Sequence, residues 1–189
     1  MFIIFSGVSA SGKNTIMQEL QKKDEKIKIL EMSSGTTRPP RESDKDNNTY
    51  LFMTREEFEK GIKENKFFEQ EEVHGYYYGI LNSALQKVID SQEIDFMRDV
   101  DVHGREKIQK HFEGKCPTLT IFLDAPNEIL AQRLKNRGES DERIKVRMAR
   151  SELERQYKND YDLVIENVNI EDTVNKILKA IKEKRKQQN

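Results

Sequence analysis

The stretch that decides the fold is residues 2–15, FIIFSGVSASGKNT. Its first part, Phe2-Ile3-Ile4-Phe5, is short and fully apolar, as a central strand of a parallel sheet requires. The spacing G-x-x-x-x-G-K follows at Gly7, Gly12 and Lys13, and then an apolar pattern at helical spacing. A strand, a glycine-rich loop and a helix in this order predict a loop that wraps phosphate groups.

The residue types of this loop suit phosphate. Glycines let the backbone turn tightly, so that successive N–H groups point at phosphate oxygens, and the following helix adds the positive end of its dipole. Lys13 then reaches the β- and γ-phosphates as a point charge. We therefore expect the loop to bind ATP through Gly7, Ser9, Ala10, Ser11, Gly12, Lys13, Asn14 and Thr15.

The residue after the lysine departs from the usual pattern. Asn14 stands where a Ser or Thr holds Mg²⁺, and a neutral amide is a less usual ligand for that ion. Thr15 offers a hydroxyl one position later. We expect Mg²⁺ to bind together with ATP, with Thr15 as the residue of the loop that contributes to the metal site.

The rest of the chain repeats the order of strand and helix. Apolar runs at 119–123 and 163–165 are each followed by a helical pattern, which predicts parallel βαβ units. The expected fold class is α/β, a P-loop NTPase-type parallel sheet with helices on both faces. The tail, residues 182–189, is expected to be a frayed helix end.

Two segments depart from this alternation of strands and helices. Residues 33–80 contain the adjacent prolines Pro39 and Pro40, which exclude a helix interior, and we expect an inserted small α+β subdomain with one helix at about 54–65. Residues 137–157 are polar and rich in arginine, and they are expected to form a helical lid.

The arginines of the expected lid follow a helical pattern. Arg143, Arg147 and Arg150 are spaced i, i+4 and i+7, so they share one helical face. Ile144 and Met148 lie on the opposite face and can pack inward. This arrangement predicts a helix that presents guanidinium groups to phosphates.

The composition excludes several classes of function. The 189 residues carry a formal net charge of -1, so no global field gathers nucleic acid or an anionic membrane. The single cysteine, Cys116, excludes an intrachain disulfide, and the sequence has no apolar run long enough to span a membrane. We expect a cytoplasmic protein whose partners are small molecules, with no nucleic acid and no membrane among them.

These residues resemble the guanylate kinase family. The resemblance rests on the phosphate loop, on Ser34, on Thr36-Thr37-Arg38-Pro39-Pro40-Arg41 and on Tyr77-Tyr78-Gly79. Related nucleoside kinases share the phosphate loop but not the arginine-rich run. Further matches, in the same order along almost the whole chain, are Asp99-Val100-Asp101-Val102-His103-Gly104, Arg133-Leu134 with Arg137-Gly138, and Tyr161-Asp162 leading to Asn167.

The resemblance implies one domain over residues 1–189 with three parts. These are a core around a five-stranded parallel sheet (1–32, 81–136 and 158–189), a monophosphate-binding insert (33–80) and the lid (137–157). The implied activity is that of an ATP-dependent nucleoside monophosphate kinase, which transfers the γ-phosphoryl group of ATP to GMP or dGMP with Mg²⁺.

The resemblance also implies roles for individual residues. Arg38 and Arg41 are expected to clamp the acceptor phosphate, since two guanidinium forks suit a dianion. Glu69 is expected to accept hydrogen bonds from guanine N1–H and the exocyclic amine. The other residues implied for GMP are Ser34, Tyr50, Tyr78 and Asp101. Those implied for phosphoryl transfer are Lys13, Arg133, Arg137 and Arg147, with Asp99 for Mg²⁺ through water and Asn167 for ATP.

One departure bears on the acceptor. Ile80 stands where the family pattern has a Ser or Thr whose hydroxyl meets guanine O6. Two other functions are therefore kept open. The first is a related kinase with a relaxed or different acceptor, another nucleoside monophosphate or ribose 1,5-bisphosphate. The second is a non-catalytic guanylate-kinase-like binding module, against which the intact Gly7, Gly12 and Lys13 argue.

Overall fold

The computed structural model describes residues 1–40, 49–73 and 75–187. The chain divides into two compact units, which are considered separately. Unit 1 comprises Met1–Ile29 and Glu93–Asn189, and unit 2 comprises Leu30–Gln92. Within the described residues, no helix combines the length and the apolar character needed to cross a membrane.

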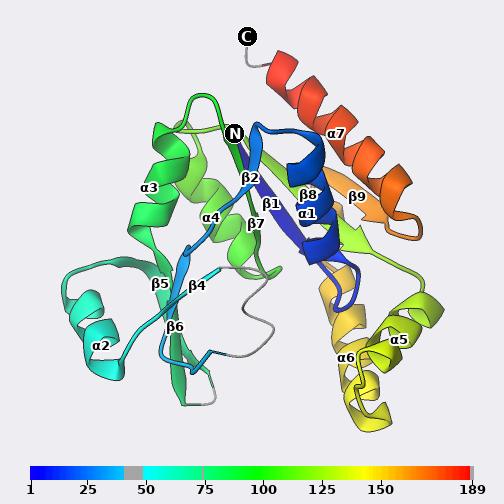
Figure 1. Ribbon diagram of the computed structural model, residues 1–189, viewed down its shortest axis with the longest axis horizontal. Coiled ribbons are helices and arrows are strands. Elements are labelled where there is room, and N and C mark those ends of the chain that lie inside the picture. The colour runs from blue at the N-terminus through cyan, green and yellow to red at the C-terminus, as the bar shows by residue number, and fades with distance from the viewer. Residues whose placement is uncertain (41–48, 74, 188–189) are drawn as a thin grey trace. The chain divides into compact units, whose positions relative to one another are not determined.

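Unit 1 is built on a parallel sheet, as the apolar runs predict. Its five strands lie in the order β2-β7-β1-β8-β9, and every neighbouring pair is parallel (Figure 1). The strands are β1 (Phe2–Gly7), β2 (Ile27–Ile29), β7 (Asp95–Asp99), β8 (Thr118–Asp124) and β9 (Leu163–Glu166).

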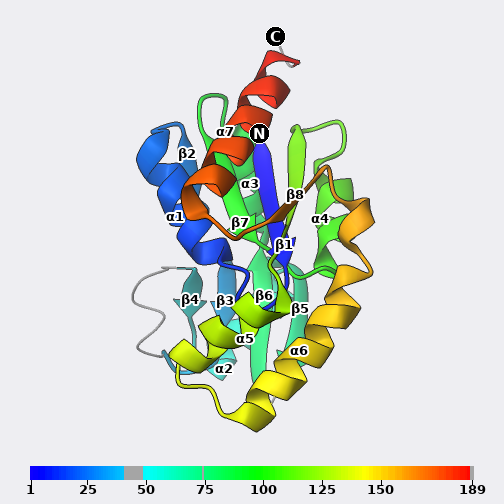
Figure 2. The ribbon, with the colours of Figure 1, turned by 90° about the vertical axis from the view of Figure 1, so that its right-hand side faces the viewer.

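Helices cover both faces of this sheet, which confirms the predicted fold class. Helices α1 (Lys13–Lys23) and α7 (Ile170–Lys186) lie side by side on one face, where they pack on Ile3 and Phe5 (Figure 2). The opposite face carries α4 (Gly104–Phe112), α5 (Asn127–Asn136) and α6 (Asp141–Arg155). The 3₁₀ turn Lys158–Asp160 leads into β9. Because successive strand residues point to opposite faces, β1 is apolar on both.

The expectation of a frayed C-terminal end is wrong for residues 182–186. Helix α7 continues to Lys186, and Arg185 fastens it to the rest of unit 1. The Arg185 guanidinium donates to Asp24 at 2.8 Å and to Asp95 at 2.6 Å. Two carboxylates from distant segments therefore hold the end of α7, which the sequence alone suggests is only surrounded by solvent.

Unit 2 is a small α+β structure, as is predicted from the departure of residues 33–80 from the alternation of strands and helices. Its four strands lie in the order β4-β3-β6-β5, with β3 parallel to β4 and antiparallel to β6. The strands are β3 (Ser34–Thr36), β4 (Tyr50–Phe52), β5 (Phe67–Val73) and β6 (Tyr76–Leu81), and the helices are α2 (Arg55–Lys63) and α3 (Asn82–Asp90). Unit 2 encloses the predicted insert, residues 33–80, and adds α3.

Helix α2 begins at a capping box. The Glu57 N–H donates to the Thr54 hydroxyl at 3.1 Å, and the Thr54 N–H donates to the Glu57 carboxylate at 2.7 Å. Two N–H groups that the first turn leaves unpaired are thus satisfied. The helix predicted at about 54–65 is confirmed.

An aromatic stack surrounded by glycines forms the centre of unit 2. The ring of Phe58, on α2, lies 4.2 Å from that of Phe67 and 5.2 Å from that of Tyr77, centroid to centroid. The backbones of Gly35, Gly61 and Gly79 approach the Phe67 ring so closely that an added Cβ would lie within 2.9 Å of it. These glycines give the ring its space.

Gly79→Ala is expected to destabilise the protein by about 2 kcal/mol, because overpacking a filled core costs that much. The new Cβ would stand 2.7 Å from Phe67 Cδ1 and 3.0 Å from Phe58 Cζ. Chemical denaturation measures the loss. Adding Phe67→Leu should recover part of it, and a double variant as unstable as the sum of the two single losses would contradict the ring contact as the cause.

Candidate active site

The loop between β1 and α1 has the backbone that the glycine spacing predicts. Gly7, Ala10 and Gly12 all have positive φ, at 140°, 64° and 97°. Helix α1 starts directly after Gly12, so its first N–H groups, which have no partner within a helix, face the loop. This is the geometry that binds anions at a helix N-terminus.

The loop rests on the end of strand β8. The Val8 N–H donates to the Leu123 carbonyl at 3.2 Å. A Cβ on Gly7 would lie 2.0 Å from that same carbonyl oxygen, so no side chain fits there. Gly7 is therefore required for the contact between loop and sheet as well as for the turn.

Lys13 lies against the loop's own backbone. Its ammonium donates to the Gly7 carbonyl at 2.7 Å and to the Val8 carbonyl at 3.4 Å. Its Nζ stands 4.0 Å from the carboxylate of Asp99, which ends the neighbouring strand β7. The structure thus brings together Lys13 and Asp99, which are predicted for phosphate and for Mg²⁺.

The environment of Asp99 acts on its proton affinity in two directions. Desolvation by the surrounding protein raises the pKa of Asp99, and the charges of Lys13 and Arg98 lower it, with a net increase. However, 42% of the side-chain surface is exposed, so water screens much of this effect. A carboxylate that is open to solvent beside the loop suits a hydrated cation.

Arg133 and Asn167 brace the loop from two later segments. Arg133, on α5, donates to the carbonyls of Ala10 and Ser11, each at 3.2 Å, and to the Asn167 carbonyl at 2.9 Å. The Asn167 amide donates to the Ser11 carbonyl at 2.7 Å. Burial lowers the pKa of Arg133, and the charge of Arg137 lowers it further.

A cavity of about 290 Å³ opens beside the loop. Its lining combines residues of the loop, α5 and the β9–α7 connection: Ala10, Gly12, Thr15, Arg133, Asn136, Arg137, Asn167 and Ile170. Asn136 and Ile170 are absent from the sequence-based prediction. The spacing of Asn136 from Arg133, i and i+3 on one helix face, is the signal that could have found the first of them. Asn14 is exposed and is not among the lining residues.

Two buried polar atoms near this cavity lack a protein partner. Within the described part of the chain, Ser11 Oγ and Asn167 Oδ1 make no hydrogen bond. Unpaired buried polar atoms are costly unless a ligand or water completes them. Their position suits a ligand that brings both donors and acceptors.

The predicted lid is a helix, and it touches the loop. Ser140 caps α6, accepting from the Arg143 N–H at 3.4 Å, and Ile144 and Met148 pack inward as predicted. From this helix Arg147 donates to the Ser9 hydroxyl at 3.1 Å and pairs with Glu139 at 2.9 Å. Unit 1 therefore gathers Lys13, Arg133 and Arg147 at one loop.

Asp101, predicted near the acceptor base, has a local partner in unit 1. One of its carboxylate oxygens accepts from the N–H groups of His103 and Gly104, each at 2.8 Å. These bonds hold the turn that leads into α4. The role of Asp101 toward a nucleotide base stays a prediction.

In unit 2 the residues predicted for the acceptor share one face of the sheet. Ser34 is the register partner of both Tyr50 and Ile80, and Ile80 is also that of Glu69. Tyr78 lies two residues before Ile80 on β6 and so points to the same side. The structure thus brings Ser34, Tyr50, Glu69 and Tyr78 together around Ile80.

Arg38 lies at the edge of this face. Its guanidinium carbon stands 5.5 Å from the ring centroid of Tyr50 and 5.7 Å from that of Phe52, a cation–π arrangement. The same group donates to the Pro39 carbonyl at 2.7 Å. Arg41, the second predicted phosphate clamp, lies outside the described residues.

No set of three or more His, Cys, Asp or Glu side chains within residues 1–40, 49–73 and 75–187 could hold a metal ion by itself. Magnesium does not require such a set, because it keeps several waters and binds through one or two carboxylates and the phosphates of its substrate. The Asp99 carboxylate beside the phosphate loop fits that mode of binding.

Comparison with known proteins points to one family. The sequence model described as guanylate kinase matches residues 1–184. A guanylate kinase of Rickettsia bellii is 34% identical over 191 aligned positions, covering 100% of this chain and 97% of its own. One of Helicobacter pylori is 37% identical over 183 positions, covering 95% of this chain and 85% of its own.

Solved structures agree on the fold. A guanylate kinase from Anaplasma phagocytophilum superposes with a TM-score of 0.69 at 23% identity, covering 97% of this chain and 85% of its own. A shikimate kinase from Aquifex aeolicus superposes with a TM-score of 0.51 at 16% identity, covering 97% of each chain. At these identities the likeness establishes the architecture alone.

Proposed function

The chain belongs to the guanylate kinase family, and we propose that it transfers the γ-phosphoryl group of ATP to GMP or dGMP, giving ADP and GDP. One structural observation supports this activity in addition to the family membership. Three cationic side chains from three separate helices, Lys13, Arg133 and Arg147, all donate hydrogen bonds to the glycine-rich loop. So much positive charge at an anion-binding helix N-terminus suits a polyphosphate.

Unit 1 would bind the donor, ATP. Its phosphates would lie in the loop from Gly7 to Thr15, with Arg137 of the cavity wall near them. The cavity beside the loop is of the right order of size for a base and part of its sugar. Asn167 Oδ1, buried without a partner among the described residues, would accept from an adenine amino group.

Unit 2 would bind the acceptor. Glu69 on the sheet face would accept from guanine N1–H and the exocyclic amine, which favours guanine because adenine has no N1–H to donate. Ser34 would contact the base edge, and Arg38 and Arg41 would hold the phosphate, with hydroxyls from Tyr50 and Tyr78. Asp101 of unit 1 is proposed as a further acid near the base.

The reaction would be an in-line displacement. An oxygen of the acceptor phosphate forms a bond to the γ-phosphorus as the bond from that phosphorus to the β–γ bridging oxygen breaks, and ADP leaves. The acceptor phosphate is already a nucleophile near neutral pH, so no general base is needed. Catalysis is then positioning plus neutralisation of charge by Lys13, Arg133, Arg137 and Arg147.

Mg²⁺ is expected to accompany ATP. When bound, it would supply positive charge that offsets the charge of the phosphates. Asp99 would hold it through water, and the Thr15 hydroxyl, on the exposed first turn of α1, would be the contribution of the loop. We also propose a cytoplasmic location with nucleotides as the partners, and the net charge of -1 argues against nucleic acid or an anionic membrane as a partner.

Release of ADP from ATP and Mg²⁺ in the presence of different acceptors tests this function. The acceptors are GMP, dGMP, IMP, AMP, CMP, UMP and ribose 1,5-bisphosphate. The proposal expects a strong signal with GMP and dGMP and a weaker one with IMP. A strong signal with ribose 1,5-bisphosphate alone would show that this compound, and not GMP, is the acceptor. No signal with any of these compounds would favour a non-catalytic binding module.

Ile80→Thr is expected to lower the KM for GMP about tenfold, because a hydroxyl restores one buried hydrogen bond to the base. Ile80 is 7% exposed between Ser34 and Glu69, so the new hydroxyl would face the same side as both. Ile80→Val is the matched control, with nearly the same shape and no hydroxyl. Steady-state kinetics with GMP and AMP decide, and an equal gain with AMP would contradict the proposed contact.

A further inference from the structure

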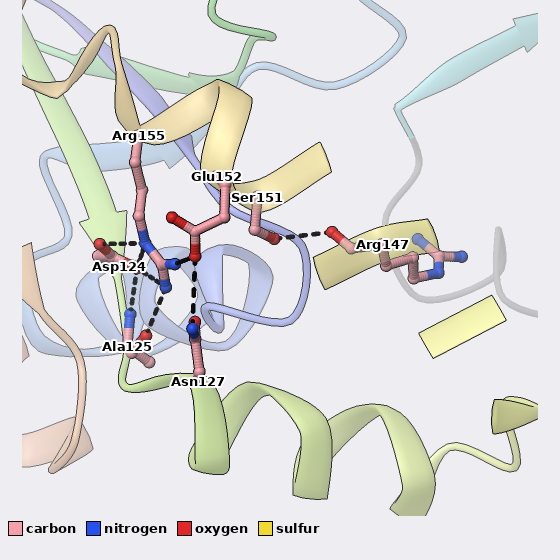
Figure 3. A network of polar contacts seen from close by, with 7 residues as sticks. All are labelled: Asp124, Ala125, Asn127, Arg147, Ser151, Glu152 and Arg155. Carbon is pink, nitrogen blue, oxygen red and sulfur yellow. Dashed lines mark hydrogen bonds and ion pairs between the residues drawn. The ribbon is translucent and has the colours of Figure 1, made fainter. Parts of the chain in front are cut away.

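The last turn of helix α6 is fastened to the junction between β8 and α5. The Arg155 guanidinium grips the Asp124 carboxylate with two parallel bonds, Nε to Oδ2 at 2.9 Å and Nη2 to Oδ1 at 3.0 Å. Arg155 Nη2 also donates to the Ala125 carbonyl at 3.1 Å. Figure 3 shows these contacts converging on one guanidinium group.

Neighbouring side chains tighten the same contact. Glu152, one turn earlier on α6, pairs with Arg155 and accepts from the Asn127 amide at 3.3 Å. Asp124 is itself oriented, because its Oδ1 accepts from the Ala125 N–H at 2.8 Å. Asp124 and Arg155 expose only 16% and 17% of their side chains, so this pair is better shielded from water than an ordinary surface ion pair.

The junction is also where the phosphate loop rests. Asp124 directly follows Leu123, whose carbonyl accepts from the Val8 N–H of the loop. Arg155 therefore ties α6 to the strand end that supports the loop. Eight residues before Arg155, about 12 Å along the helix, Arg147 reaches the Ser9 hydroxyl. The apolar side chains Ile144 and Met148 of α6 pack on unit 1, and so does Tyr157 just after the helix, while Arg155 provides the polar contact of the last turn.

We propose that the Asp124–Arg155 ion pair is a positioning device for phosphoryl transfer, which holds the last turn of α6 on the β8–α5 junction and so keeps the Arg147 guanidinium at the phosphate loop. The inference rests on the proposed function, since it assigns Arg147 to the transferring phosphoryl group. Asp124 and Arg155 are positioning residues, because they act through Arg147 and touch no substrate. Neither residue belongs to the sequence motifs described above.

Asp124→Asn tests the proposal, because it keeps the shape of the side chain and removes its charge. We expect kcat with ATP and GMP to fall about fivefold and both KM values to change less than about twofold, the pattern of a contact made in the transition state. In an Arg147→Met background the same substitution should lower kcat no further, since its effect passes through Arg147. An equal fall in both backgrounds would overturn the proposal.

A matched control separates positioning from stability. Asp24→Asn breaks another arginine–carboxylate pair of unit 1, that with Arg185 at the far end of α7. It should lower the midpoint of unfolding as Asp124→Asn does and leave kcat unchanged. If Asp24→Asn lowered kcat as much, the effect of Asp124 would be one of general stability and the proposal would fall.

Amide hydrogen exchange tests whether Asp124 holds α6 in place, and it does not depend on enzymatic activity. Peptides from residues 141–155 should exchange faster in Asp124→Asn than in the unaltered chain and in Asp24→Asn, because the helix end is released. Unchanged exchange would overturn the proposal. An unaltered chain that releases no ADP with GMP would overturn the proposed function instead, and exchange would still decide whether Asp124 holds α6.

Discussion

Replacing Lys13 with alanine is expected to lower kcat at least about a hundredfold while changing stability by less than about 1 kcal/mol. The ammonium lies at the mouth of the phosphate loop, bonded to the Gly7 carbonyl at 2.7 Å and 4.0 Å from Asp99. It is one of the charges that would neutralise the transferring phosphoryl group. The Lys13 side chain is 16% exposed but lies against the phosphate loop and outside the apolar core, so the fold should tolerate its removal.

Steady-state kinetics and chemical denaturation of the same preparation check both parts of this result. Lys22→Ala is a matched control, since Lys22 lies on the same helix, is 68% exposed and pairs with Glu19 three residues earlier. It should leave kcat unchanged. Near-normal turnover of Lys13→Ala would show that the Lys13 charge takes no part in the reaction, and it would contradict the proposed mechanism.

Gly7→Ala is expected to destabilise the protein by about 4 kcal/mol or more, a size that points to a specific clash. Its Cβ would lie 2.0 Å from the Leu123 carbonyl oxygen, and a φ of 140° strains any side chain besides. The obstacle is backbone in the interior strand β8, which cannot move without disturbing the sheet.

Gly12→Ala is the matched comparison for Gly7→Ala. Its φ of 97° is also strained, but its Cβ would meet the end of a side chain, Asn167 Nδ2, at 2.6 Å. That amide can turn away and give up its bond to Ser11, so the stability loss should be smaller and the loss of ATP affinity larger. Denaturation and ATP titration decide, and equal destabilisation by both alanines would contradict the role given to the Leu123 contact.

The sequence predicts most reliably what neighbouring residues encode. Strand, glycine loop and helix follow one another within residues 2–23, so the phosphate loop could be predicted with its strand and helix. The same holds for the amphipathic pattern of α6, whose Ile144 and Met148 pack inward as the spacing indicates.

Contacts between distant segments could not be predicted in this way. The pairing of Arg185 with Asp24 spans 161 residues, and the bond from Asn167 to Ser11 spans 156. No periodic pattern marks such partners, which is why the end of α7 looks frayed in the sequence and is a helix in the structure. Asp124 and Arg155 escaped prediction for the same reason, although a carboxylate at the end of a parallel strand is a recognisable place for function.

In unit 2 the sequence identifies the residues expected at the acceptor site, but it does not show how they are arranged in space. The resemblance to guanylate kinases supplies Ser34, Tyr50, Glu69 and Tyr78 as separate expectations. That they share one face follows only from the strand register, in which Ile80 is the partner of both Ser34 and Glu69. A shift of one residue would turn a whole strand to the other face, and the sequence alone does not fix that choice.

Transfer of label from γ-³²P-ATP to GMP is the most direct test of the central claim. With Mg²⁺ and the unaltered chain, the account predicts that the label appears in GDP in step with ADP formation, and that Lys13→Ala forms almost no labelled GDP. Label recovered only as inorganic phosphate, or ADP formed at a rate that does not depend on GMP, would contradict it.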